Sequence, residues 1–119
     1  MIDLPILTVS GTPQDMGQQQ GEALRSVIRD FVDVRFEALA GYLADRATKD
    51  DDLFEVGAQS MDIHESWDSD GVAEHRGIAS ATGIDPVKLY IATNMTDIRD
   101  ILVLPTDADA EGCSSLLVP

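Results

Sequence analysis

The chain has 119 residues, of which 44% are hydrophobic, and this is the size of one domain with a modest core. Its 22 acidic residues against 8 lysines and arginines give a formal net charge of −14, which argues against nucleic acid or an anionic membrane as a partner. The single cysteine excludes an internal disulfide framework and, with an N-terminus that lacks a secretory pattern, favours a cytoplasmic protein.

The N-terminal third predicts a short strand followed by a long helix. Residues 6–10 (ILTVS) read as a strand that Gly11 ends, and Thr12 can cap a helix whose first residue is Pro13. From there apolar residues recur at helical spacing, which predicts one amphipathic helix to about residue 46. Gly17 and Gly21 lie one turn apart on this helix, so we expect another backbone to pack closely against them.

Three more helices are expected before an acidic linker. A helix is predicted over 51–67, with Trp67 as a core anchor, and another over 72–82, ended by Gly83. Asp85 can cap a further helix that ends near Asn94 or continues toward residue 102. Residues 105–112 form an acidic linker, and the apolar run after it reads as a second strand. The sequence therefore predicts a mainly helical chain with a short strand at each end, an α+β class.

No cofactor or metal site is predicted from the residue pattern. His64 and His75 lack further ligands at metal-binding spacing, so both are expected on the solvated surface. Asn94 and the charged residues after it could line a cleft or hold the following loop. Surface ion pairing between Asp97 and neighbouring arginines is the alternative interpretation.

The lone cysteine, Cys113, follows Gly112 at the junction between the acidic linker and the apolar run. Such a thiol is either a small buried hydrophobic residue or the nucleophile of a self-cleaving peptide bond. In the second case the thiol attacks the carbonyl carbon of Gly112, and hydrolysis of the resulting thioester frees Cys113 as a new N-terminus. The liberated α-amine, with a pKa of about 8, can then act as the general base for its own thiol.

Three blocks in order carry a resemblance to a known family. They are residues 11–24 (GTPQDMGQQQGEAL), residues 74–85 (EHRGIASATGID) with 89–98 (LYIATNMTDI), and residues 111–115 (EGCSS). The chain resembles the acyl-coenzyme A:6-aminopenicillanic acid acyltransferase family, which are cysteine N-terminal-nucleophile (Ntn) hydrolases. The blocks cover most of the chain, and the combination is far more specific than any one of them.

The resemblance implies an incomplete enzyme. Residues 1–112 would be the helical α or pro region and residues 113–119 the first strand of the catalytic β region of a four-layer αββα fold, whose remainder is absent. Gly112 and Cys113 would form the processing site and Cys113 the catalytic nucleophile. The implied activity is hydrolysis of a linear amide, or acyl transfer, through an acyl-cysteine. The partners would be the C-terminal catalytic chain of the same precursor and a small amide or acyl donor, with a higher oligomer possible. The alternative is a noncatalytic, acidic helical interaction module.

Overall fold

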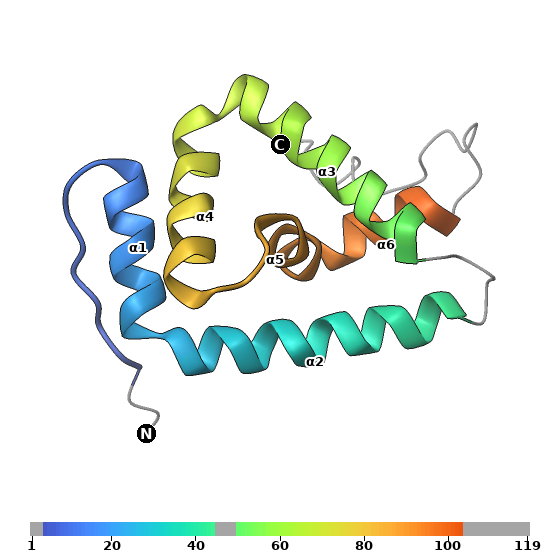
Figure 1. Cartoon of the computed structure of the whole chain (residues 1–119), viewed down its shortest axis with the longest axis horizontal. Helices are drawn as coiled ribbons and strands as arrows, with labels where there is room; N and C mark the ends of the chain where they lie inside the picture. Colours follow the sequence, from blue (N-terminus) through green and yellow to red (C-terminus); the bar gives the residue numbers. More distant parts are fainter. Residues whose placement is uncertain (1–3, 45–49, 104–119) are drawn as a thin grey trace, which may run out of the picture.

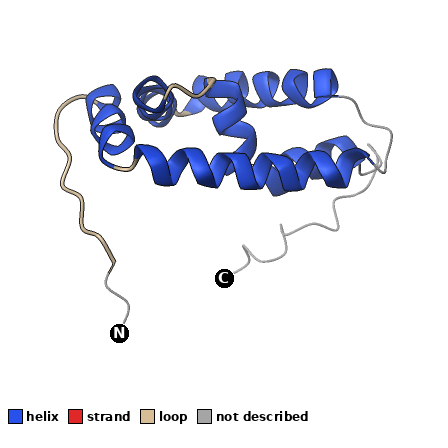
Figure 2. Ribbon diagram, turned by 60° about the horizontal axis from the view of Figure 1, so that its bottom comes forward, coloured by secondary structure: helices blue, strands red, loops and turns tan. Residues whose placement is uncertain are grey.

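The computed structural model of the chain describes residues 4–44 and 50–103. Within them lie six helices and no strand. In Figure 2 the regular structure is coloured as helix throughout. The helices are α1 Pro13–Ala23, α2 Arg25–Ala44, α3 Asp50–Trp67, α4 Ser69–Thr82, α5 Pro86–Thr93 and α6 Met95–Val103. The predicted α+β class with a short strand at each end is therefore wrong, because this part of the chain is all-helical.

The expected N-terminal strand over residues 6–10 is a segment without a neighbouring strand among the described residues. A side chain takes the place of a strand partner at its end. The Ser10 N–H donates to Gln19 Oε1 at 3.2 Å, and Gln19 Nε2 donates to the Ser10 carbonyl at 2.7 Å. These two bonds fix the segment to α1, and Gly11, with a φ of 112°, makes the turn into the helix. The expected strand over residues 113–119 lies outside the described residues.

Local capping residues set most helix ends where the sequence predicts them. Thr12 and Asp15 form a reciprocal capping box at the start of α1, with Pro13 as the first helical residue. Asp85 accepts from the backbone N–H groups at the start of α5. Gly83 ends α4 in the left-handed conformation, with a φ of 72°. The helices predicted over 51–67 and 72–82 are confirmed as α3 and α4, the latter starting three residues earlier.

The single long helix expected from Thr12 to about residue 46 is instead two helices. Leu24 leaves the helical conformation, with φ −118° and ψ 23°, while its N–H still bonds to the Gln20 carbonyl at 3.0 Å. Asn94 makes a similar joint between α5 and α6, with φ −116° and ψ 33°. The predicted helix end near Asn94 is confirmed, and the Asn94 side chain bonds locally to the Tyr90 carbonyl at 3.0 Å. Leu24 is neither a glycine nor a proline, and the sequence around it predicts no break.

Helices α1 and α4 lie side by side, as Figure 1 shows, and glycines bring their backbones together. A Cβ placed on Gly17 would lie 1.9 Å from the Glu74 carbonyl oxygen, and one on Gly77 would lie 2.2 Å from the Gln14 carbonyl oxygen. A Cβ on Gly21 would lie 2.7 Å from the Ala81 Cβ. The predicted close packing at Gly17 and Gly21 is confirmed, and its partner is α4.

Helix α5 forms the centre of the core, in contact with α2, α3 and α4. Its residues Ile91 and Ala92 are fully buried. The larger apolar cluster comprises Leu39, Leu43, Leu53, Met61, Val72, Tyr90, Ile91 and Ile98, and the smaller one comprises Val32, Ala79, Leu89 and Ala92. The expectation that Trp67 anchors the core is wrong, since this residue is 71% exposed at the end of α3.

Candidate functional site

The predicted processing and catalytic residues, Gly112 and Cys113, lie outside the described residues, so their roles stay predictions. Among the described residues, the titratable side chains gather instead where α3, α4 and α5 meet. A pocket of about 290 Å³ opens there, lined by His64, Asp68, Gly71, Val72, His75, Tyr90, Thr93 and Asn94. We call it the His64–Tyr90 pocket.

A chain of hydrogen bonds runs from a carboxylate through an imidazole to a phenol in this pocket. His64 Nε2 lies 3.2 Å from Asp68 Oδ2, and His64 Nδ1 lies 3.2 Å from the Tyr90 hydroxyl. His64 is in the last turn of α3, and Asp68 is the single residue between α3 and α4, so the two side chains are one turn apart across the corner. The arrangement fixes that corner to α5.

Asp68 has a second role as the N-cap of α4. Its Oδ1 accepts from the Gly71 N–H at 3.0 Å. That backbone bond, and next the bond from His64, hold the pKa of the Asp68 carboxyl below its usual value. The carboxylate is therefore ionised at neutral pH and can only accept a hydrogen bond, so His64 Nε2 is the donor of the bond between them.

His75 and Tyr90 are both kept neutral at the base of the pocket. Burial lowers the pKa of His75, although the bond from its Nε2 to the Pro86 carbonyl, at 2.8 Å, acts in the opposite direction. Burial also raises the pKa of Tyr90, and the charge of Asp97 adds to that rise. The two rings meet edge to face with centroids 5.7 Å apart. A neutral histidine at this depth is a hydrogen-bond donor that ties α4 to the start of α5.

The hydrogen bonds of this network hold α3, α4 and α5 together. Tyr90 is 9% exposed and remains protonated, so its oxygen is a poor nucleophile at neutral pH. In the described ranges, no buried side-chain polar atom lacks a hydrogen-bond partner, and no group of three or more potential ligands could hold a metal ion. The polar side chains that line the pocket are therefore hydrogen-bonded to one another and to the backbone, and these bonds connect the three helices.

The sequence does not predict this network. His64 and His75 were expected on the solvated surface, and that expectation is wrong because both are partly buried and hydrogen-bonded. Trp67 covers His64 instead of entering the core, with the two rings parallel and 4.5 Å apart. The four-residue spacing of His64 and Asp68, at the end of the helix predicted over 51–67, is the local signal that could have indicated their pairing.

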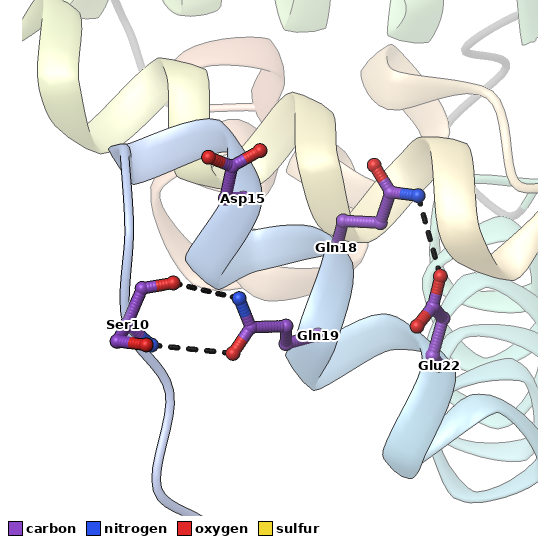
Figure 3. A pocket seen from close by; sticks show the side chains of 5 residues that line it. All are labelled: Ser10, Asp15, Gln18, Gln19 and Glu22. Atoms are coloured by element: carbon purple, nitrogen blue, oxygen red, sulfur yellow. Dashed lines mark hydrogen bonds between the residues drawn. The ribbon is translucent and has the colours of Figure 1, made fainter.

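A second, more open pocket lies between the N-terminal segment and α1, and Figure 3 shows its lining. Its polar residues bond to one another. Gln19 holds both backbone groups of Ser10, and Gln18 donates to Glu22 at 3.2 Å. Asp15 is occupied by the capping box. These contacts anchor the segment before α1 and leave no evident group for chemistry.

Asn94 and the charged residues after it were expected to line a cleft, to hold the following loop or to form surface ion pairs. Asn94 lines the His64–Tyr90 pocket, where its Nδ2 donates to the Tyr90 carbonyl at 3.0 Å. Arg99 pairs with Asp100 at 3.2 Å and its guanidinium lies over the Tyr42 ring, so the arginine partner is Asp100 rather than the expected Asp97. The charge of Asp97 instead adds to the effect of burial in raising the pKa of Tyr90.

Comparisons with known proteins add no assignment. No family model, curated protein or solved structure matches this chain. Every helix in the described ranges is too short or too polar to cross a bilayer.

Proposed function

We propose that this chain is the N-terminal helical part of an autoprocessing cysteine Ntn hydrolase or acyltransferase. The observation that carries the proposal is the order of the three sequence blocks, at residues 11–24, at 74–85 with 89–98, and at 111–115. In the described structure the first block lies in α1 and its preceding turn, and the second begins in α4.

The packing of α1 against α4 supports reading the first two blocks as one structural unit. Gly17 and Gly21 come from the first block and Gly77 from the second, and each meets the opposite helix at a distance that leaves no room for a side chain. Helix packing thus accounts for these three glycines, whereas Gly11 makes the turn before α1 and Gly83 ends α4. What the third block adds is a nucleophile, because Cys113 is the cysteine of the sequence.

In the proposed mechanism the Cys113 thiol attacks the carbonyl carbon of Gly112 within the same chain. The acyl group moves from nitrogen to sulfur, and water hydrolyses the thioester to a Gly112 carboxylate and a free Cys113. The new α-amine, with a pKa of about 8, then removes the thiol proton during turnover. The thiolate attacks the carbonyl carbon of a linear amide or acyl donor, whose amine or thiol leaves with a proton. The acyl group of the resulting acyl-cysteine then passes to water or to an amine, which regenerates the thiol. Oxyanion donors and the acyl pocket come from the catalytic part that follows.

The same proposal places the protein in the cytoplasm, where a single thiol stays reduced. Its partner is the catalytic chain produced from the same precursor, and its substrate is a small amide or acyl donor. The −14 charge supports a role that involves neither nucleic acid nor an anionic membrane surface.

The test is the fate of the bond between Gly112 and Cys113 in the product of the complete reading frame. We expect intact-mass measurement and N-terminal sequencing to find a chain that begins at Cys113, without added protease. Cys113→Ala should leave one uncut, inactive polypeptide. Ser114→Ala, one residue away, is the matched control and should still be cut.

Two outcomes would contradict the proposal. An active enzyme in which Cys113 remains amide-linked to Gly112 would indicate an internal cysteine hydrolase. A reading frame that stops after Pro119, with no cognate second chain, would favour the noncatalytic acidic interaction module.

A further inference from the structure

Helix α2 carries an exposed apolar stripe on its outer side. Val27, Phe31 and Val34 are 63%, 43% and 67% exposed, although all three are large hydrophobic residues. Ala38 and Gly41 are exposed one and two turns further on, and a Cβ added to Gly41 would meet no atom within 4 Å. Spacings of three and four residues put all five on one face of the helix. We call this face the α2 stripe.

The α2 stripe adjoins the side of the helix that faces the core. Val32, Leu39 and Leu43 are buried against the other helices, and Ile28 packs beside them. Arg35 lies between the two faces, with its Nε bonded to the Ala92 carbonyl at 2.9 Å and its guanidinium 5.1 Å from the centre of the Phe31 ring. The apolar surface of α2 is therefore wider than the described helices cover, which is typical of a helix that packs on two sides.

The charge of α2 differs from that of the chain as a whole. Its acidic and basic residues balance, being Arg25, Arg29 and Arg35 against Asp30, Asp33 and Glu37, whereas the chain has a net charge of −14. A basic partner would be drawn to the more acidic faces of the molecule rather than to this one. The face fits an apolar and nearly neutral surface, as found inside one protein or in an obligate complex.

A second copy of the chain fits the α2 stripe poorly. Antiparallel pairing of two such stripes sets the residues that flank them on the same side opposite each other. Asp30 of one copy would then face Glu37 of the other, and the like charges would repel at both ends of the pair. The net charge of −14 on each copy adds a longer-range repulsion.

We infer that the α2 stripe is covered by the catalytic part that follows Cys113 in the same precursor, an inference that rests on the proposed function. The position of α6 supports this occupant. Leu102 and Val103, at the end of α6, pack on the core cluster that contains Leu39 and Leu43 of α2, and α6 contacts both α2 and α3, so the chain leaves the described helices beside these two helices. A tether at that point gives the following part a high effective concentration at this helix.

The test compares the 119-residue chain with the product of the complete reading frame. Hydroxyl-radical labelling of the unmodified proteins should oxidise Phe31 several-fold less in the complete product. In a second measurement, Val34→Asp is introduced into both, with Ser26→Asp on the exposed polar side of α2 as the matched control. In the 119-residue chain both variants should melt within about 2 °C of the parent. In the complete product Val34→Asp should lower the melting temperature by at least about 4 °C, because it buries a charge, and Ser26→Asp should not.

The outcomes separate this inference from the proposed function. Equal labelling of Phe31 in both proteins, or equal effects of the two variants in the complete product, would overturn it. A dimer of the 119-residue chain that Val34→Asp converts to monomer would assign the stripe to a second copy instead. If the precursor is cut before Cys113 but Phe31 stays exposed, this inference is wrong and the proposed function stands. If Phe31 is protected in a precursor that is not cut, the α2 stripe is covered but the autoprocessing function is wrong.

Discussion

Gly17→Ala tests whether the close approach of α1 and α4 holds this fold together. The added methyl group would lie 1.9 Å from the Glu74 carbonyl oxygen and 2.7 Å from the Glu74 carbonyl carbon, whereas ordinary contacts begin near 3.4 Å. The obstacle is the backbone of a helix rather than the end of a flexible side chain. The methyl group fits only if α1 and α4 separate, and separation weakens the packing along both helices.

The expected magnitude is the balance of two opposing effects. Alanine favours a helix over glycine by about 1 kcal/mol, because it restricts the unfolded chain. Overpacking a well-filled interface typically costs about 1–3 kcal/mol, and a backbone obstacle this close belongs at the upper end of that range. We therefore expect the free energy of unfolding to fall by about 1–2 kcal/mol, which lowers the melting temperature by roughly 4–16 °C for a domain of this size.

Gly41→Ala is the matched control, because a Cβ at Gly41 meets no atom within 4 Å. It should raise the free energy of unfolding by about 0.5–1 kcal/mol through helix propensity alone. Urea unfolding followed by circular dichroism measures both variants under one condition. The argument fails if Gly17→Ala is as stable as the parent or more so, or if the two alanine variants change stability in the same direction.

Three further outcomes are expected. The 119-residue chain alone should show no amidase or acyltransferase turnover, since one oxyanion-hole donor typically contributes ~10²-fold or more; turnover that Cys113→Ala abolishes would contradict this. If the surface with its net charge of −14 is adapted to salt, the melting temperature should rise steadily from ~0.1 M KCl toward molar concentrations. The reason is that the Debye length falls to ~3 Å, which screens the repulsion between acidic groups. An unchanged melting temperature would indicate an ordinary acidic protein. Burial lowers the pKa of His75 below its usual 6.5, so the unfolded chain takes up this proton first. The stability that neutral His75 contributes to the fold is fully present above pH 6.5, and it is lost as the pH falls through the lowered pKa of the folded state. The urea midpoint of the parent should therefore drop relative to His75→Gln on acidification, and parallel curves would refute this.

The parts of the fold that the sequence predicts well are those set by local chemistry. Thr12, Gly83 and Asp85 act on backbone groups within four residues, so their effect is readable from the sequence around them. The end of α5 at Asn94 is also local, because the Asn94 side chain bonds to the Tyr90 carbonyl four residues back. The break at Leu24 carries no such signal. Nor does the segment over residues 6–10, where the Gln19 side chain takes the position of a strand partner.

The His64–Tyr90 pocket could be predicted only in part, for a similar reason. The spacing of His64 and Asp68 is local, and a turn between them brings both to one corner. The partners Tyr90 and Pro86 come from α5, and nothing near either histidine in the sequence identifies them. Trp67 shows the same limit, because its size favours the core, whereas the imidazole of His64 offers it a stacking surface at the rim.

Helix α2 shows why apolar spacing alone does not identify the core. The sequence places Val27, Phe31 and Val34 in the same apolar pattern as Leu39 and Leu43, and a single amphipathic face was predicted from all of them. The structure divides that pattern into a buried side and an exposed side. The periodicity of apolar residues indicates how wide the apolar surface of a helix is, but the burial of that surface depends on which other elements pack against it. An apolar pattern too wide for the helices around it is therefore a reason to look for a further packing partner.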